Sequence, residues 1–179
     1  QIPKKDSSEH RNVNIFQIPD EAVSYLVYSK LLQKNKHRLS SFSYAYRNDR
    51  NVHFAIQDIA LDMRDTPRIY IAEFDFKDFF GSINHSFIIN QYDKNGFMIS
   101  KFERYIIQQF LEMNINLKDG ESYRGIAQGT SISLFLANMV CWELDKSFEL
   151  NGLRFARYAD DTIIWSDSYS NISKAFSLI

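Results

Sequence analysis

Residues 157–161 read Arg157-Tyr158-Ala159-Asp160-Asp161, and the segments on either side of them indicate the fold. Apolar, strand-forming residues precede this stretch at 153–156 and follow it at 162–165. Two such runs joined by a short segment predict a β-hairpin, here with two adjacent carboxylates at its tip. Adjacent aspartates repel each other, and a divalent cation bound between them relieves the repulsion. A solvated turn could have the same sequence, so the interpretation depends on a third carboxylate elsewhere.

A third aspartate, Asp75, ends another strand-forming run. The segment Ile69-Tyr70-Ile71-Ala72-Glu73-Phe74-Asp75 is nearly continuous in apolar side chains, which predicts a strand buried on both faces. Asp75 stands where the chain leaves this strand. If the strand and the hairpin are neighbours in one sheet, Asp75, Asp160 and Asp161 converge at one edge.

Length and composition predict a globular protein without a membrane span. The chain has 179 residues, enough for one sizeable core, and no apolar run is long enough to cross a bilayer. Its single cysteine, Cys141, excludes a disulfide framework and suits a reducing compartment such as a cytoplasm. The net charge is −1, but residues 30–50 hold six Lys or Arg side chains against Asp49 alone. Such a basic segment suits an anionic partner, and it equally suits an ordinary solvated loop.

Several helices are predicted around these strands. One begins at Pro19 and runs to about Leu32, and another begins at Asn51 with apolar residues at helical spacing up to Met63. The sequence predicts further helices from about His85, from the capping box at Ser100 to about Asn114, and from about Ser170. A long helix is predicted from about Ser131 to a stop at Asn151-Gly152, and turns at Asn95-Gly96 and Lys118-Asp119-Gly120.

The three carboxylates predict a site for hard divalent cations. Oxygen ligands suit Mg²⁺ or Mn²⁺, which take their remaining ligands from water and from substrate phosphates. Two such ions about 3.5–4 Å apart can hold the attacking and leaving oxygens of a phosphoryl transfer. The sequence contains no plausible set of His and Cys ligands for zinc, which argues against a zinc site.

Three motifs in this order resemble those of reverse transcriptases. Motif A is resembled by residues 74–83, which read Phe74-Asp75-Phe76-Lys77-Asp78-Phe79-Phe80-Gly81-Ser82-Ile83. Motif B is resembled by residues 125–138, which run from Gly125-Ile126-Ala127-Gln128-Gly129 to Leu136-Ala137-Asn138. Motif C is resembled by residues 158–161. Residues 41–47 resemble the element between fingers and palm in bacterial members. The amino-acid sequences of motifs A and B are most similar to those of abortive-infection and other defence-associated enzymes. Retron and group II intron enzymes are the next most similar.

The resemblance implies a role for each matching residue. Asp75, Asp160 and Asp161 would be the catalytic carboxylates, with Asp75, Asp160 and the carbonyl of Phe76 as metal ligands and Asp161 in support. Phe80 would pack under the sugar of the incoming nucleotide, and Gln128 and Gly129 would contact the nucleotide and the primer end. Asp78 would lie near the triphosphate, or cap the turn. Two Mg²⁺ ions, or Mn²⁺, would be the cofactors, and deoxynucleoside triphosphates, an RNA template and a DNA primer strand the partners.

The fold class expected from the resemblance is α+β, a polymerase palm whose antiparallel sheet packs on helices. Residues 1–66 would form a partial fingers region and residues 67–179 the palm; because little chain follows motif C, we expect the thumb to be absent and the sequence to be part of a longer polypeptide. Ala127 stands where many relatives have proline. Two alternatives to templated synthesis stay open: template-independent or protein-primed DNA synthesis by the same site, and an inactive palm that only binds nucleic acid or protein.

Overall fold

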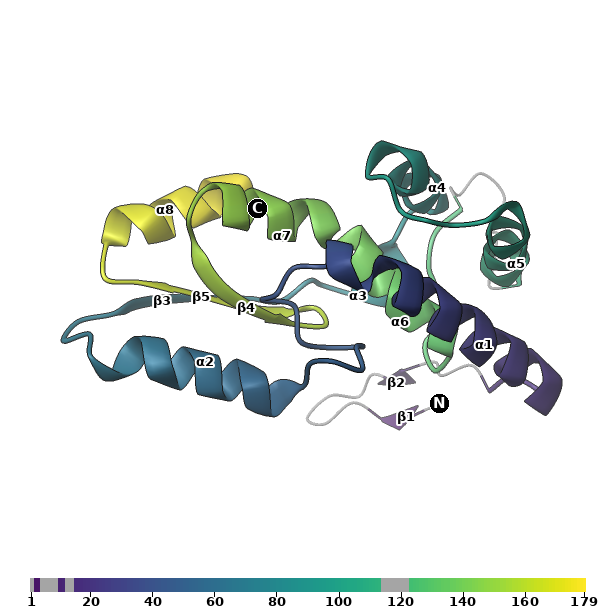
Figure 1. Ribbon diagram of the computed structural model, residues 1–179, viewed down its shortest axis with the longest axis horizontal. Helices are drawn as coiled ribbons and strands as arrows, with labels where there is room; N and C mark the ends of the chain where they lie inside the picture. The colour runs from purple at the N-terminus through teal and green to yellow at the C-terminus, as the bar shows by residue number, and fades with distance from the viewer. Residues whose placement is uncertain (1, 4–9, 12–14, 114–122) are drawn as a thin grey trace. The chain divides into compact units, whose positions relative to one another are not determined.

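The computed structural model describes residues 2–3, 10–11, 15–113 and 123–179, which divide into two compact units (Figure 1). Unit 1 comprises residues 1–35 and 78–137, and unit 2 comprises residues 36–77 and 138–179. The predicted turn at 118–120 lies outside the described residues. Within the described part of the chain, no helix is both long and apolar enough to cross a membrane.

Unit 2 is built on a three-stranded antiparallel sheet of order β3-β5-β4. Its strands are β3 (Tyr70–Phe74), β4 (Arg154–Tyr158) and β5 (Asp161–Ser166). The last pair of the β4–β5 hairpin joins Tyr158 to Asp161, so Ala159 and Asp160 form its two-residue loop. The predicted hairpin is therefore confirmed, and so is the predicted strand that leads to Asp75.

Helices cover both faces of this sheet (Figure 1). On one face, α7 (Trp142–Leu150) and α8 (Tyr169–Leu178) enclose a core that includes Phe148, Phe155 and Ile164. On the other face, α2 (Val52–Arg64) packs on Ala156 and Trp165 together with Tyr44. Burial of these large side chains, at about 1.5–3 kcal/mol each, is the main force that holds the layers together.

Strand β3 is not buried on both faces, contrary to the prediction. Tyr70, Ala72 and Phe74 pack on the core beneath α7 and α8, whereas Ile71 points away and is 55% exposed. The reason is position: β3 is the edge strand, and the buried contacts of α2 fall on β4 and β5. An apolar run of this length does not reveal which of its residues face solvent.

Helix α2 begins where the sequence predicts, because the Asn51 side chain accepts hydrogen bonds from the backbone amides of His53 and Phe54. Ala55 is the only residue of α2 that is fully buried; Ile59 and Met63 are partly buried, and Ile56 is 59% exposed. The predicted apolar stripe therefore exceeds the face that packs.

Unit 1 is mainly helical. Its elements are the short pair β1 (Ile2–Pro3) and β2 (His10–Arg11), followed by α1 (Ile18–Asn35), α3 (Phe79–Ser82), α4 (His85–Lys94), α5 (Lys101–Glu112) and most of α6 (Ser131–Val140). The predicted capping box is present, since Ser100 and Glu103 bond reciprocally, and Lys34 of α1 also pairs with Glu103. Together these contacts fix the start of α5 against α1.

The predicted long helix from Ser131 is two consecutive helices. Helix α6 ends at Val140, Cys141 forms a turn, and α7 begins at Trp142. No Pro or Gly marks this break, and the apolar spacing continues through it, so the sequence pattern does not reveal it. The stop at Asn151-Gly152 is confirmed.

Candidate active site

The tip of the β4–β5 hairpin carries the first two candidate residues. Ala159 has a backbone φ of +62°, in the left-handed region that non-glycine residues rarely adopt. Asp160 follows it in the loop and is half-buried, and Asp161 is the exposed first residue of β5. A tight two-residue loop therefore places the two carboxylates at the end of the sheet.

Asp75 belongs to the same end of the sheet. The last pair between β3 and β5 joins Phe74 to Thr162, so the register places Asp75 opposite Asp161 one step further on. Burial raises the pKa of Asp161, and the charges of Asp160, Asp75 and Glu73 raise it further. The predicted strand pairing is thus present, and the carboxylates of Asp160, Asp75 and Glu73 lie within electrostatic range of Asp161.

The donor chemistry of this cluster fits a hard divalent cation. Carboxylate oxygens are the ligands that Mg²⁺ prefers, and the mutual repulsion at Asp161 is the kind that such an ion neutralises. In the conformation of the described residues, no three His, Cys, Asp or Glu side chains are grouped closely enough to hold a metal ion. Phe76, whose carbonyl is the fourth predicted ligand, follows β3 by two residues and is half-buried.

Two more predicted residues lie in unit 1, at the turn that opens α3. Phe79 is buried at 6% exposure, whereas its neighbour Phe80 is half-buried, and the two rings meet edge to face at 5.3 Å. Asp78 precedes α3 with a φ of +49°, and its side chain makes no capping hydrogen bond. Its carboxylate lies over Gly81, where an added Cβ would come within 2.7 Å of both carboxylate oxygens. The predicted capping role of Asp78 is therefore not present in this structure.

The predicted nucleotide loop 125–129, also in unit 1, is held on this turn. The amides of Gly125 and Ile126 donate to the carbonyls of Ile83 and Phe80 at 2.8 Å each. Gly125 has a φ of +90° and sits so close that a Cβ would lie 3.3 Å from the Gly81 carbonyl, so only glycine fits without strain.

Gln128 and Gly129 lie in the same loop, half-buried and exposed respectively. At the far end of the loop, the Ser133 hydroxyl of α6 donates to the Ala127 carbonyl at 2.5 Å. The loop is thus fixed at both ends. Of the predicted site residues, Asp75, Phe76, Asp160 and Asp161 belong to unit 2. The other four, Asp78, Phe80, Gln128 and Gly129, belong to unit 1.

Two residues near the aspartates received no role from the sequence. Tyr46 has a φ of +60°; burial raises its pKa, and the charge of Asp160 raises it further. Arg157 is fully buried in unit 2 beneath the hairpin tip and forms an ion pair with Asp145. Its position in a strand between Phe155 and Asp160 was visible in the sequence, but its buried partner was not.

Arg47 illustrates the opposite outcome. It belongs to the basic segment 30–50, for which the sequence left open an anionic partner or an ordinary solvated loop. The structure instead leaves its side chain 5% exposed, paired with Asp49 and bonded to the carbonyls of Ser40 and Ser43. Arg47 therefore stabilises the loop.

The class of protein is defined by a small antiparallel sheet that is covered by helices and carries aspartates at one end. The whole of residues 2–179 matches the family model described as "Reverse transcriptase (RNA-dependent DNA polymerase)". The chain belongs to the reverse transcriptase family. The predicted α+β fold is confirmed.

Solved structures of telomerases are similar in fold. One is telomerase from Candida albicans in complex with a TWJ fragment of telomeric RNA, at 13% identity and a TM-score of 0.55 over 89% of this chain and 31% of that chain. Another is apo telomerase from Candida tropicalis truncated from its C-terminal domain, at 18% identity and a TM-score of 0.54 over 89% and 36%. The chain thus spans about a third of the telomerase chains it matches. No curated protein matches the sequence.

Proposed function

We propose that the protein is an RNA-directed DNA polymerase whose catalytic residues are Asp75, Asp160 and Asp161. The observation that carries the proposal is the pairing of β3 with β5, whose register continues to Asp75 opposite Asp161, the residue after Asp160, in a member of the reverse transcriptase family. Three carboxylates from two separate chain segments at one end of a sheet are costly unless they bind cations. Structural stability alone does not explain them.

The same residues are proposed to hold two Mg²⁺ ions, which Mn²⁺ could replace. Asp75, Asp160 and the Phe76 carbonyl would be the ligands, with Asp161 in support. Such ions, when bound, favour ionisation of a primer 3′-hydroxyl and neutralise charge on the triphosphate. The protein's own contribution is to hold these oxygens at or just beyond the ends of paired strands, which resist displacement.

We further propose that Asp78, Phe80, Gln128 and Gly129 bind the incoming deoxynucleoside triphosphate, next to an RNA template and a DNA primer strand. The hydrogen bonds that fix loop 125–129 to the α3 turn support this grouping, because they bring the two predicted nucleotide-binding segments together within unit 1. The division into a partial fingers region, 1–66, and a palm, 67–179, stays a prediction.

Replacing Phe80 by alanine is expected to relax sugar selection. Phe80 is only half-buried, so its ring is free to lie under the nucleotide sugar and exclude a 2′-hydroxyl. The variant should keep much of its deoxynucleotide activity and gain ribonucleotide incorporation, measured side by side on one primer. Phe79→Ala is the matched control: its ring is buried, so this change should cost about 3–5 kcal/mol of stability with no shift in sugar preference. A Phe80→Ala protein that loses stability while still rejecting ribonucleotides would assign Phe80 to the core.

The finer assignment, DNA synthesis in bacterial anti-phage defence, rests on the amino-acid sequences of motifs A and B. How the DNA is made can be tested with the full-length protein, supplied with deoxynucleotides and with or without a defined RNA. A templated enzyme yields DNA complementary to the RNA, and sequencing of the product identifies this. DNA of restricted composition made without RNA would support template-independent or protein-primed synthesis. No incorporation under either condition, with Mg²⁺ or Mn²⁺, would leave the inactive binding palm.

A further inference from the structure

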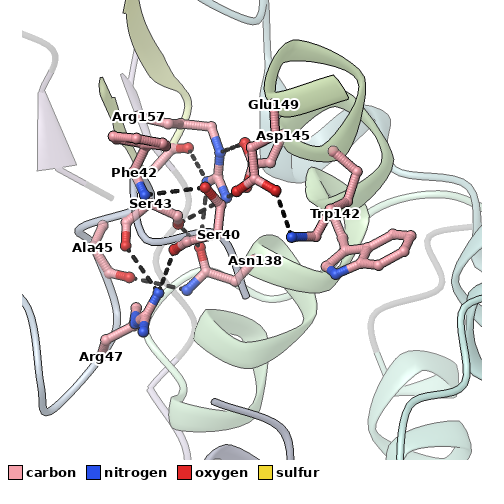
Figure 2. Close-up of polar contacts among 12 residues, drawn as sticks. Ser40, Phe42, Ser43, Ala45, Arg47, Asn138, Trp142, Asp145, Glu149 and Arg157 are labelled. Atoms are coloured by element: carbon pink, nitrogen blue, oxygen red, sulfur yellow. Dashed lines mark hydrogen bonds and ion pairs between the residues drawn. The ribbon is translucent and has the colours of Figure 1, made fainter. Parts of the chain in front are cut away.

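Arg157 is a buried cation with every donor used. Its side chain, like that of Asp145, is 1% exposed, and the two form a bidentate pair from Nε to Oδ1 at 2.7 Å and from Nη2 to Oδ2 at 2.6 Å (Figure 2). The three remaining donors bond Ser43 Oγ at 2.9 Å, Asn138 Oδ1 at 3.2 Å and the Ala159 carbonyl at 2.8 Å. We call Arg157, Asp145, Asn138 and Ser43 the Arg157 network.

The network joins segments that are distant in the sequence. Asn138 of α6 also accepts from Ser43 Oγ and donates to the Ala45 carbonyl at 2.9 Å (Figure 2). The Arg157 backbone pairs with the same segment, since its amide donates to the Phe42 carbonyl and its carbonyl accepts from the Tyr44 amide. The guanidinium is therefore held from several directions and has little freedom to move.

One bond of the network reaches the hairpin tip. The Ala159 carbonyl that accepts from Arg157 Nη1 belongs to the same peptide group as the Asp160 amide. Ala159 itself has a φ of +62°, a conformation that alanine avoids unless its surroundings hold it. The orientation of this peptide group sets where the Asp160 side chain begins.

We propose that Arg157 is a positioning residue that fixes the Ala159–Asp160 peptide and so directs the Asp160 carboxylate, a role that rests on the proposed function of Asp160. A buried ion pair of this kind often contributes no more stability than apolar side chains of the same size. An apolar residue at 157 would, however, offer no donor to the Ala159 carbonyl. A guanidinium oriented by Asp145 supplies a fixed donor, which a flexible lysine does not.

The first test compares Arg157→Lys with the matched control Arg154→Lys in the full-length protein. Arg154 lies on the same strand but is exposed, with an ion pair to Asp62 at 3.9 Å. Arg157→Lys is expected to lower kcat for nucleotide incorporation roughly 100-fold, as small misplacements of reacting groups do, with KM for the deoxynucleotide unchanged. Hydrogen exchange of the tip amides, measured without metal, should become faster in this variant alone. A wild-type kcat in folded Arg157→Lys protein would overturn the proposal.

A rescue separates positioning from general stability. Glycine adopts a positive φ without the penalty that alanine carries, so adding Ala159→Gly to Arg157→Lys should restore kcat by roughly tenfold. If Arg157→Lys does not fold, the apolar pair Asp145→Leu/Arg157→Met replaces it, because such pairs often retain stability. That pair should also show fast tip exchange and low kcat, and full activity in it would overturn the proposal.

The proposal can fail separately from the polymerase assignment. If the wild-type protein incorporates no nucleotide, the proposed function fails, and the network is then judged on hydrogen exchange and on Mn²⁺ affinity measured by electron paramagnetic resonance. Mn²⁺ affinity should fall in Arg157→Lys and not in Arg154→Lys. Equal affinity and equal tip exchange in the two variants would reject the positioning role.

Discussion

Replacing Asp160 or Asp75 with asparagine in the full-length protein is expected to abolish nucleotide incorporation. Each substitution keeps the size of the side chain and removes one negative charge from a cluster where Asp161 already experiences two neighbouring carboxylates and Glu73. Loss of one anionic ligand misplaces the cation, and removal of a single group that stabilises transition-state charge typically costs about 100- to 1,000-fold in rate. Primer extension with a labelled deoxynucleotide measures the loss.

The controls for this prediction lie in the same sheet. Asp161→Asn should reduce incorporation less, because Asp161 is assigned a supporting role. Asp167→Asn should have no effect, since Asp167 is an exposed aspartate just beyond the opposite end of β5. Unchanged synthesis by Asp75→Asn would reject the polymerase assignment, because the proposal requires Asp75, which directly follows β3, to act with the hairpin aspartates.

The local elements of this fold were predictable because their signals are local. The hairpin around Asp160, the strand before Asp75 and the cap at Ser100 each depend on residues a few positions apart, and the structure confirms all three. Whether β3 is an edge or a central strand depends on chain that is distant in sequence. The apolar run 69–75 therefore predicted its strand correctly and its burial wrongly.

The candidate site divides in the same way. Asp75, Asp160 and Asp161 could be chosen because each ends a strand-forming run or forms a hairpin tip and because each falls in a short motif, so that the signal is local. Arg157 gave no comparable signal, since an arginine in a strand normally extends into solvent. Its burial became visible only with Asp145, Asn138 and Ser43 in place around it.

Replacing Asp145 with alanine is expected to lower the free energy of unfolding by about 3–5 kcal/mol, the usual cost of removing one partner from a buried ion pair. The guanidinium of Arg157 cannot release its proton at ordinary pH, so the variant must bury an uncompensated charge. Two of its five hydrogen bonds would also be lost. Denaturant unfolding followed by tryptophan fluorescence measures the change, since both tryptophans of this sequence, Trp142 and Trp165, lie in unit 2.

Glu149→Ala is the matched control, because Glu149 lies on the same helix and pairs with Lys146 at 2.5 Å, but both side chains are partly exposed. Water screens that pair, so its loss should cost at most about 1 kcal/mol. The double variant Asp145→Leu/Arg157→Met removes both charges and should be more stable than Asp145→Ala, although it has lost the same ion pair. That order would show that the cost of Asp145→Ala comes from the stranded Arg157 charge. If Asp145→Ala were instead as stable as Glu149→Ala, Arg157 would have an alternative partner or access to water, and the hairpin tip would not depend on Asp145.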